Sequence, residues 1–249
     1  MFIQMLFSEN LKYKRTFAKK LSLIAPAFFI LYAILSLNSF NTEYNYFEYT
    51  VFNWWPFIFV PLIISIISSL SIQREKKYGT YRILKIHSIN MFKMYSSKVL
   101  IIGFYVLIST IILIITLLLV KLFIPSSISS VTLIFKANLI ICFTSLSLIP
   151  INLFFAEKLG MIASLIINFI GMFSGVIMAP ENIWLLNPWS WSLRLLCPIV
   201  KVHPNGVPLG INSELLNSNV IFPGITISII SFVILTILIT IWFVKREVH

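Results

Sequence analysis

Six long runs of apolar residues, separated by shorter polar segments, divide the 249-residue chain. A run of roughly 20 mostly apolar residues is long enough to cross the hydrocarbon core of a bilayer as an α-helix. The pattern predicts six membrane-spanning helices, at residues 21–37, 54–72, 98–124, 131–155, 161–179 and 220–244. We therefore expect an all-α integral membrane protein with a single transmembrane domain over residues 1–249.

The composition supports a lipid environment. Charged residues make up only 11% of the chain and hydrophobic residues 59%, whereas soluble domains contain about 25% charged residues. The net charge of +11 is typical of nucleic-acid-binding proteins, but basic residues that flank the cytoplasmic ends of helices explain it more simply. The expected surroundings are a bilayer, and no nucleic acid.

The distribution of Lys and Arg predicts the orientation of the chain. Fifteen of the nineteen lie in the N-terminal segment, the segment after the second span, the link after the fourth span and the C-terminal tail. The other side has four. Because cytoplasmic loops are enriched in basic residues, both termini are expected in the cytoplasm.

The first twenty residues predict an amphipathic helix in the membrane interface. Lys12, Arg15 and Lys19 recur at helical spacing, beside a separate stripe rich in aromatic residues. Such a helix places its basic groups at anionic headgroups; the alternative is a frayed cytoplasmic tail. The apolar run that follows lacks the small-residue cleavage site of a signal peptide, so we expect it to remain in the protein as the first span.

The spans contain no sign of ion coupling or catalysis. No charge lies near the middle of a span, where each would cost about 2.5–3.5 kcal/mol. The three histidines lie outside the spans without a metal or triad pattern, and a phosphate-binding P-loop is missing. We expect no enzyme activity and no cofactor in this chain. We interpret Cys142 and Cys197 as free thiols, with a disulfide as the alternative.

Two glycines in the fifth span indicate close helix packing. Gly171 and Gly175 form a GxxxG pair, which lets two helix backbones approach closely. The pair fits tight packing within one subunit or an interface between subunits.

The segment 73–97, between the second and third spans, contains a motif. Glu75, Gly79, Thr80 and Leu84 resemble the Glu-x-x-x-Gly-Thr-x-x-x-Leu pattern of type-2 ABC exporter permeases, although that family's proline a few residues later is missing here. The resemblance implies a cytoplasmic coupling helix that docks on an ATPase subunit. The alternative is an ordinary basic loop, which does not explain the Glu-Gly-Thr spacing. The expected coupling residues are Arg74, Glu75, Gly79, Thr80, Ile83 and Leu84.

The segment 180–219 is broken by five prolines and cannot form a span. In the wider family, this place is occupied by a re-entrant segment on the outer side. Acidic residues on this side could attract a cationic peptide by long-range electrostatics; the alternative is that they are merely tolerated there. The expected outer, peptide-facing residues are Glu43, Glu48, Glu181, Trp189, Trp191 and Glu214.

The chain is also similar to the permeases of lantibiotic-immunity ABC transporters, through its start at Glu9–Phe17 and the outer motif Asn187–Trp191. The resemblance implies a bacterial cytoplasmic membrane protein that expels a cationic antimicrobial peptide. Its partners would be two copies of an ATP-binding subunit, which hold ATP and Mg, and a second related permease. The alternatives are another cargo, such as a lipid or a drug, and a stand-alone immunity protein that sequesters the peptide.

Overall fold

The computed structural model describes residues 2–37, 46–78 and 90–245, and in these ranges the chain is built from helices, with a single isolated β-bridge. The α-helices are α1 (Phe2–Lys12), α2 (Phe17–Leu37), α3 (Tyr46–Trp54), α4 (Val60–Lys77), α6 (Met91–Phe123), α7 (Val131–Ser145), α8 (Leu148–Leu159), α9 (Met161–Met178), α10 (Pro188–Val200) and α11 (Ile221–Lys245).

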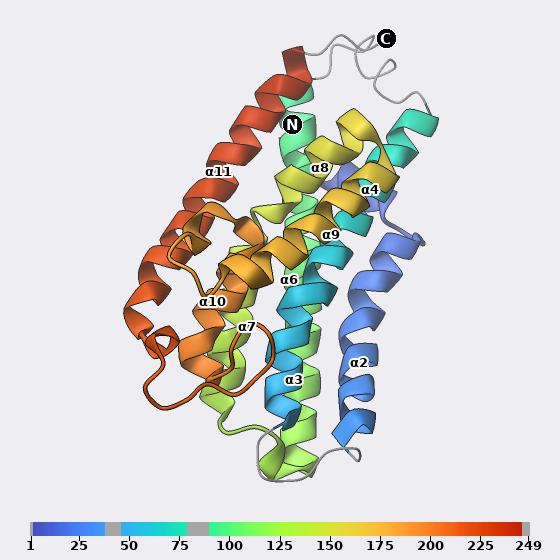
Figure 1. Ribbon diagram of the computed structural model, residues 1–249. Helices are drawn as coiled ribbons and strands as arrows, with labels where there is room; N and C mark the ends of the chain where they lie inside the picture. Colours follow the sequence, from blue (N-terminus) through green and yellow to red (C-terminus); the bar gives the residue numbers. More distant parts are fainter. Residues whose placement is uncertain (1, 38–45, 79–89, 246–249) are drawn as a thin grey trace.

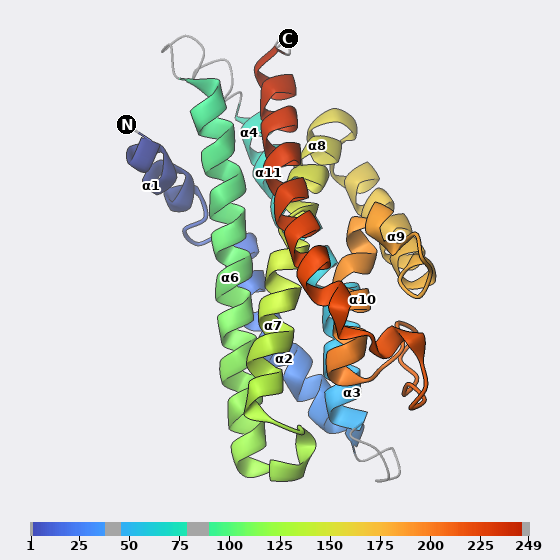
Figure 2. The ribbon, with the colours of Figure 1, turned by 90° about the vertical axis from the view of Figure 1, so that its left-hand side faces the viewer.

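Six helical segments are long and apolar enough to cross a membrane, which confirms the predicted number of spans. They are Phe17–Leu35, Tyr46–Lys77, Met91–Phe123, Val131–Leu159, Met161–Met178 and Ser218–Lys245. Figure 1 shows them as one elongated bundle. The end of α4, the start of α6, the turn between α8 and α9 and the end of α11 lie at one end of it (Figures 1 and 2). The link between α6 and α7 lies at the other end.

The second span is longer than expected. Helix begins at Tyr46 and continues without interruption to Lys77, where the sequence predicted 54–72. Residues 46–53 contain no Gly or Pro, and Phe47, Val51 and Phe52 are buried. The helix contains a π-helical turn at Trp55–Phe59. Pro56 lies in this turn, where its missing N–H disturbs the α-helical hydrogen-bond pattern.

The fourth span is broken into α7 and α8 at Leu146–Ser147. Pro150 lacks the N–H that would bond to the carbonyl of Leu146 in a continuous helix, so the break precedes it by one turn. The turn from α8 to α9 uses Gly160, whose φ of 92° is readily adopted only by glycine.

The N-terminal segment differs from the predicted helix over residues 1–20. Helix α1 ends at Lys12, a turn with Arg15 at φ 62° follows, and α2 begins at Phe17. The expected basic stripe is therefore divided between two helices. Figure 2 shows α1 beside α6, near the end of the bundle where α6 begins.

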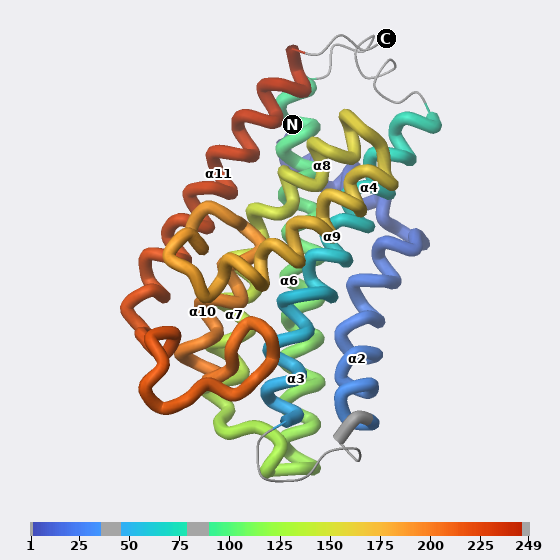
Figure 3. Tube along the Cα trace, in the orientation of Figure 1, coloured from blue at the N-terminus to red at the C-terminus, as the bar shows by residue number. Residues whose placement is uncertain are grey.

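Within the predicted segment 180–219, α10 forms a buried helix between α7, α9 and α11. Figures 1 and 3 show that the chain descends through α9 and passes through α10 before α11 returns along the bundle. Asn187 caps α10 by accepting a hydrogen bond from the backbone N–H of Trp189, and Pro188 occupies the first turn, as expected for a helix start. Arg194 is buried in α10 and donates a hydrogen bond to the carbonyl of Leu215.

Candidate functional site

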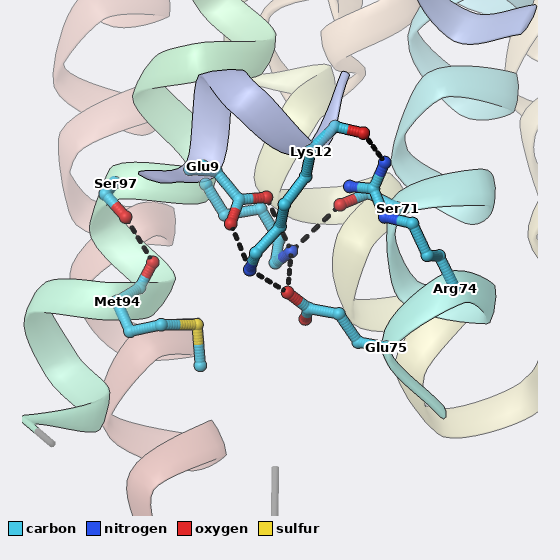
Figure 4. Close-up of polar contacts among 8 residues, drawn as sticks. Glu9, Lys12, Ser71, Arg74, Glu75, Met94 and Ser97 are labelled. Carbon is cyan, nitrogen blue, oxygen red and sulfur yellow. Dashed lines mark hydrogen bonds and ion pairs between the residues drawn. The ribbon is translucent and has the colours of Figure 1, made fainter. Parts of the chain in front are cut away.

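Four charged side chains from three helices form a closed ring (Figure 4). Lys12 Nζ lies 2.6 Å from Glu9 Oε2 and 2.7 Å from Glu75 Oε1. Lys98 Nζ lies 3.0 Å from Glu9 Oε1 and 2.9 Å from Glu75 Oε1. Each lysine thus bridges both glutamates. We call this group the charge ring; its formal charges sum to zero.

The charge ring is almost entirely buried. The side chain of Lys98 is fully buried, those of Glu9 and Glu75 are 2% exposed, and that of Lys12 is 26% exposed. Removing a charged group from water costs several kcal/mol, and close opposite charges offset that cost only while every partner is present. The ring therefore holds its three helices in one arrangement.

Further polar contacts surround the charge ring. Lys98 Nζ also donates to Ser71 Oγ on α4 at 2.9 Å. The guanidinium of Arg74 donates to the backbone carbonyl of Lys12 and lies over the ring of Tyr13, 5.1 Å from its centroid. Burial, and then the Glu9 carboxylate, raise the pKa of Tyr13 above its ordinary value. These contacts attach α1 and the turn after it to α4.

The charge ring joins the two helices that flank residues 79–89. Glu75 lies in the last turn of α4, which ends at Lys77. Lys98 lies near the start of α6, which begins at Met91 with Asn90 as its cap. A force applied to the segment between these helices would therefore act on α4, α6 and α1 together.

The family of the chain follows from a comparison with known families. The sequence model of the ABC-2 family transporter proteins matches residues 5–175, which include most of α1, most of α9 and all the described helices between them. The chain belongs to the ABC-2 transporter family. The match confirms the resemblance to type-2 ABC permeases and contains all four residues of the charge ring. No curated protein and no solved structure matches the chain.

As an ABC-2 permease, the chain is the membrane component of a transporter, and the family implies a separate ATP-binding subunit. Of the expected coupling residues, Arg74 and Glu75 come together at the charge ring, where both contact groups of the same chain. Gly79, Thr80, Ile83 and Leu84 lie outside the described residues, so the coupling helix stays a prediction.

The sequence interpretation missed Glu9, Lys12 and Lys98 as partners of Glu75. The sequence predicted Lys98 as the first residue of the third span and counted it with the basic residues before that span, but α6 begins at Met91, so Lys98 lies within the helix and is fully buried. Glu9 and Glu75 are acidic residues in segments that are otherwise basic. An acidic residue within an otherwise basic segment was the sequence feature that could have predicted these internal ion pairs.

The residues expected to face a peptide on the outer side fall into two groups. Glu181 and Glu214 are exposed. Glu48 is buried, and its Oε2 accepts a hydrogen bond from the backbone N–H of Ser129 at 2.6 Å. Trp191 is buried and donates from Nε1 to the carbonyl of Leu185 at 3.0 Å, so its indole does not face the exterior. Glu43 lies outside the described residues.

Trp189 packs on the two glycines of α9. A Cβ atom at Gly171 would lie 2.4 Å from Cε2 of the indole, and one at Gly175 would lie 2.9 Å from the backbone of Trp189. Trp189 Nε1 also donates to Asn168 Oδ1 at 2.9 Å. The GxxxG pair thus packs against a tryptophan of α10 in the same chain.

Among residues 2–37, 46–78 and 90–245, no group of three or more His, Cys, Asp or Glu side chains is arranged to hold a metal ion. Cys142 and Cys197 are both free and buried.

Proposed function

We propose that this ABC-2 permease expels a cationic antimicrobial peptide of the lantibiotic type, and so protects the cell that carries it. Family membership supports the transport role, and the similarity of the N-terminal and outer motifs to lantibiotic-immunity permeases supports the cargo. Two copies of an ATP-binding subunit would supply the energy from MgATP, and a second related permease would complete the translocation path. We propose the bacterial cytoplasmic membrane as its location, with both termini in the cytoplasm.

The charge ring is the observation that carries the coupling part of the proposal. Glu75, through Lys12, and Lys98, through Glu9, attach both helices next to residues 79–89 to α1. A motor subunit docked on that segment would move these helices as one body. Glu75 then acts as a positioning residue for the coupling helix. Residues after Glu75, among them Ile83 and Leu84, would then contact the ATP-binding subunit.

The acidic residues support the proposed charge of the cargo. Glu181 and Glu214 are exposed and are expected on the outer side. Negative charge there would attract a cationic peptide and raise its local concentration at the outer end of the permease.

The coupling proposal is tested by separating motor binding from motor coupling. The permease is co-expressed with its ATP-binding subunit, and co-purification and peptide resistance are measured. Leu84→Asp is expected to abolish co-purification. Glu75→Gln is expected to preserve co-purification but to lower resistance, because the coupling helix is no longer fixed to α1 and α6. Lys93→Gln changes an exposed residue in the first turn of α6 and serves as the matched control.

Normal resistance and normal co-purification in both Leu84→Asp and Glu75→Gln would refute the coupling assignment. The cargo is tested with a panel of cationic peptides, lipophilic drugs and lipids against cells with and without the complete transporter. Protection against peptides alone is expected. Protection confined to drugs or lipids would refute the peptide assignment while leaving the ABC-2 permease role intact. Protection that persists without the ATP-binding subunit would indicate sequestration instead of export.

A further inference from the structure

A groove lies between α7, the end of α10 and the first half of α11, far from the charge ring. Figure 2 shows α7 and α10 on either side of the start of α11. The groove has a volume of about 770 Å³, within the range of about 300–1,000 Å³ typical of small-molecule sites. It belongs to the end of the bundle opposite the two termini, which the distribution of Lys and Arg predicts to be the outer end.

The lining of the groove changes from polar to apolar along the helices. At the start of α7 it is formed by Ser130, Thr132 and Lys136, with Ser218 opposite them before α11. The rest of the lining is apolar and comprises Leu133, Leu139, Ile140 and Phe143 on α7, Pro198 and Ile199 near the end of α10, and Ile221, Ile225 and Ile229 on the first half of α11. From Lys136 to Phe143 the helix advances by about 10 Å. A polar mouth above apolar walls of this depth matches a molecule with a polar head and a hydrocarbon chain.

Lys136 gives the mouth of the groove its charge. Its side chain is exposed, and among the residues that the structure describes it forms no ion pair and no hydrogen bond. None of the described residues that line the groove is acidic. A lysine so close to the end of a span can extend its ammonium group to the depth of the lipid headgroups. The groove therefore offers one positive charge and supplies no counter-charge of its own.

We propose that this groove binds an anionic phospholipid, with the phosphate at Lys136 and one acyl chain along α7 and α11. The charge of Lys136 favours an anionic headgroup over a zwitterionic one, because the groove has no acidic residue to pair with a choline. The apolar walls require a lipid and exclude a free phosphate as the natural occupant. The inference does not depend on the cargo proposed above, since it concerns a site on the membrane-facing side of a single permease.

Lipid binding to the purified full-length permease in detergent tests this inference by native mass spectrometry. Dioleoyl phosphatidylglycerol and dioleoyl phosphatidylcholine are compared. The wild type is expected to retain phosphatidylglycerol preferentially. Lys136→Gln is expected to lower phosphatidylglycerol binding about fivefold, the effect of one basic residue at an anionic surface, without changing phosphatidylcholine binding. Lys136→Arg preserves the charge and is expected to preserve the preference.

Two further variants separate the headgroup from the acyl chain. Leu139→Trp fills the apolar wall and is expected to weaken the binding of both lipids. Lys201→Asn removes another exposed lysine near the groove at a position of positive φ, which Asn tolerates, and is expected to leave binding unchanged. Size-exclusion profiles verify that each variant is folded.

Three results would overturn the inference. The first is equal retention of the two lipids by the wild type. The second is a loss of phosphatidylglycerol in Lys201→Asn as large as in Lys136→Gln. The third is complete displacement of the lipid by glycerol phosphate at millimolar concentration, which would show that the acyl chain contributes nothing.

Discussion

The Nζ atom of Lys98 lies 2.9 Å from Oε1 of Glu75, and at most 2% of either side chain is exposed. The pair connects the last turn of α4 with the start of α6, and Glu9 and Lys12 of α1 complete the arrangement. Four charges that neutralise one another can remain buried together, but removing any one of them leaves a buried net charge that is no longer balanced.

Lys98→Met is therefore expected to destabilise the protein by about 3–5 kcal/mol, because it leaves the two glutamates with a single lysine. The double variant Lys98→Met with Glu75→Gln retains the Glu9–Lys12 pair and is expected to recover much of this loss. Thermal unfolding of the purified permease in detergent measures the effect, with Lys93→Met as the exposed control. Additive effects of the two substitutions would show that the side chains do not interact.

The contact between α9 and α10 predicts different outcomes for its two glycines. Gly171→Ala and Gly175→Ala each crowd Trp189 and are expected to destabilise by about 1–3 kcal/mol, the usual cost of overpacking. Adding Trp189→Leu is expected to relieve Gly171→Ala, whose methyl group would meet the indole. It is not expected to relieve Gly175→Ala, whose methyl group would meet the backbone of residue 189. Thermal unfolding of the two double variants, relative to Trp189→Leu alone, distinguishes these outcomes. Equal rescue of both glycines would contradict the described packing.

Glu48 and Glu181 are expected to differ in what they contribute. Glu48→Gln weakens a buried hydrogen bond to the backbone of Ser129 and is expected to cost about 1–3 kcal/mol of stability. Glu181→Gln changes an exposed side chain and is expected to cost nothing measurable, while lowering peptide resistance under the proposed function. Stability is measured by thermal unfolding, and resistance in cells that carry the complete transporter. An unfolding temperature of Glu48→Gln equal to that of the wild type would show that this buried hydrogen bond does not stabilise the protein.

Cys197 is expected to resist alkylation over a wide pH range. Burial raises the pKa of its thiol to about 12, and only the thiolate reacts. A raised pKa keeps the thiol protonated at neutral pH, and at pH 9 only about one molecule in a thousand would hold a thiolate. In the Cys142→Ala variant, maleimide labelling of the native protein is expected to stay slow from pH 7 to pH 9, and to become rapid after unfolding in sodium dodecyl sulfate. Labelling of the native protein that saturates near pH 8.5 would contradict the described burial.

The sequence predicts the number of spans because each span must meet the same requirement, about 20 apolar residues in a row. It predicts helix ends less well. The start of the second span at Tyr46 depends on the burial of Phe47 and Val51 against other helices, which a local pattern does not contain. The partners of Glu75 were missed for the same reason, since Glu9 and Lys98 are far from it in the sequence and meet it only in the folded bundle.

The charge ring also constrains how the protein is made. Glu9 and Lys12 leave the ribosome before Lys98, which contacts Glu9 from the third span and follows the first two spans in the sequence. Until then Glu9 and Glu75 share a single lysine, and α1 has no complete set of partners. Helix α1 is thus fixed only when the third span is in place. A truncation that removes Glu9 and Lys12 would therefore leave Glu75 and Lys98 without their partners on α1 when the three spans assemble.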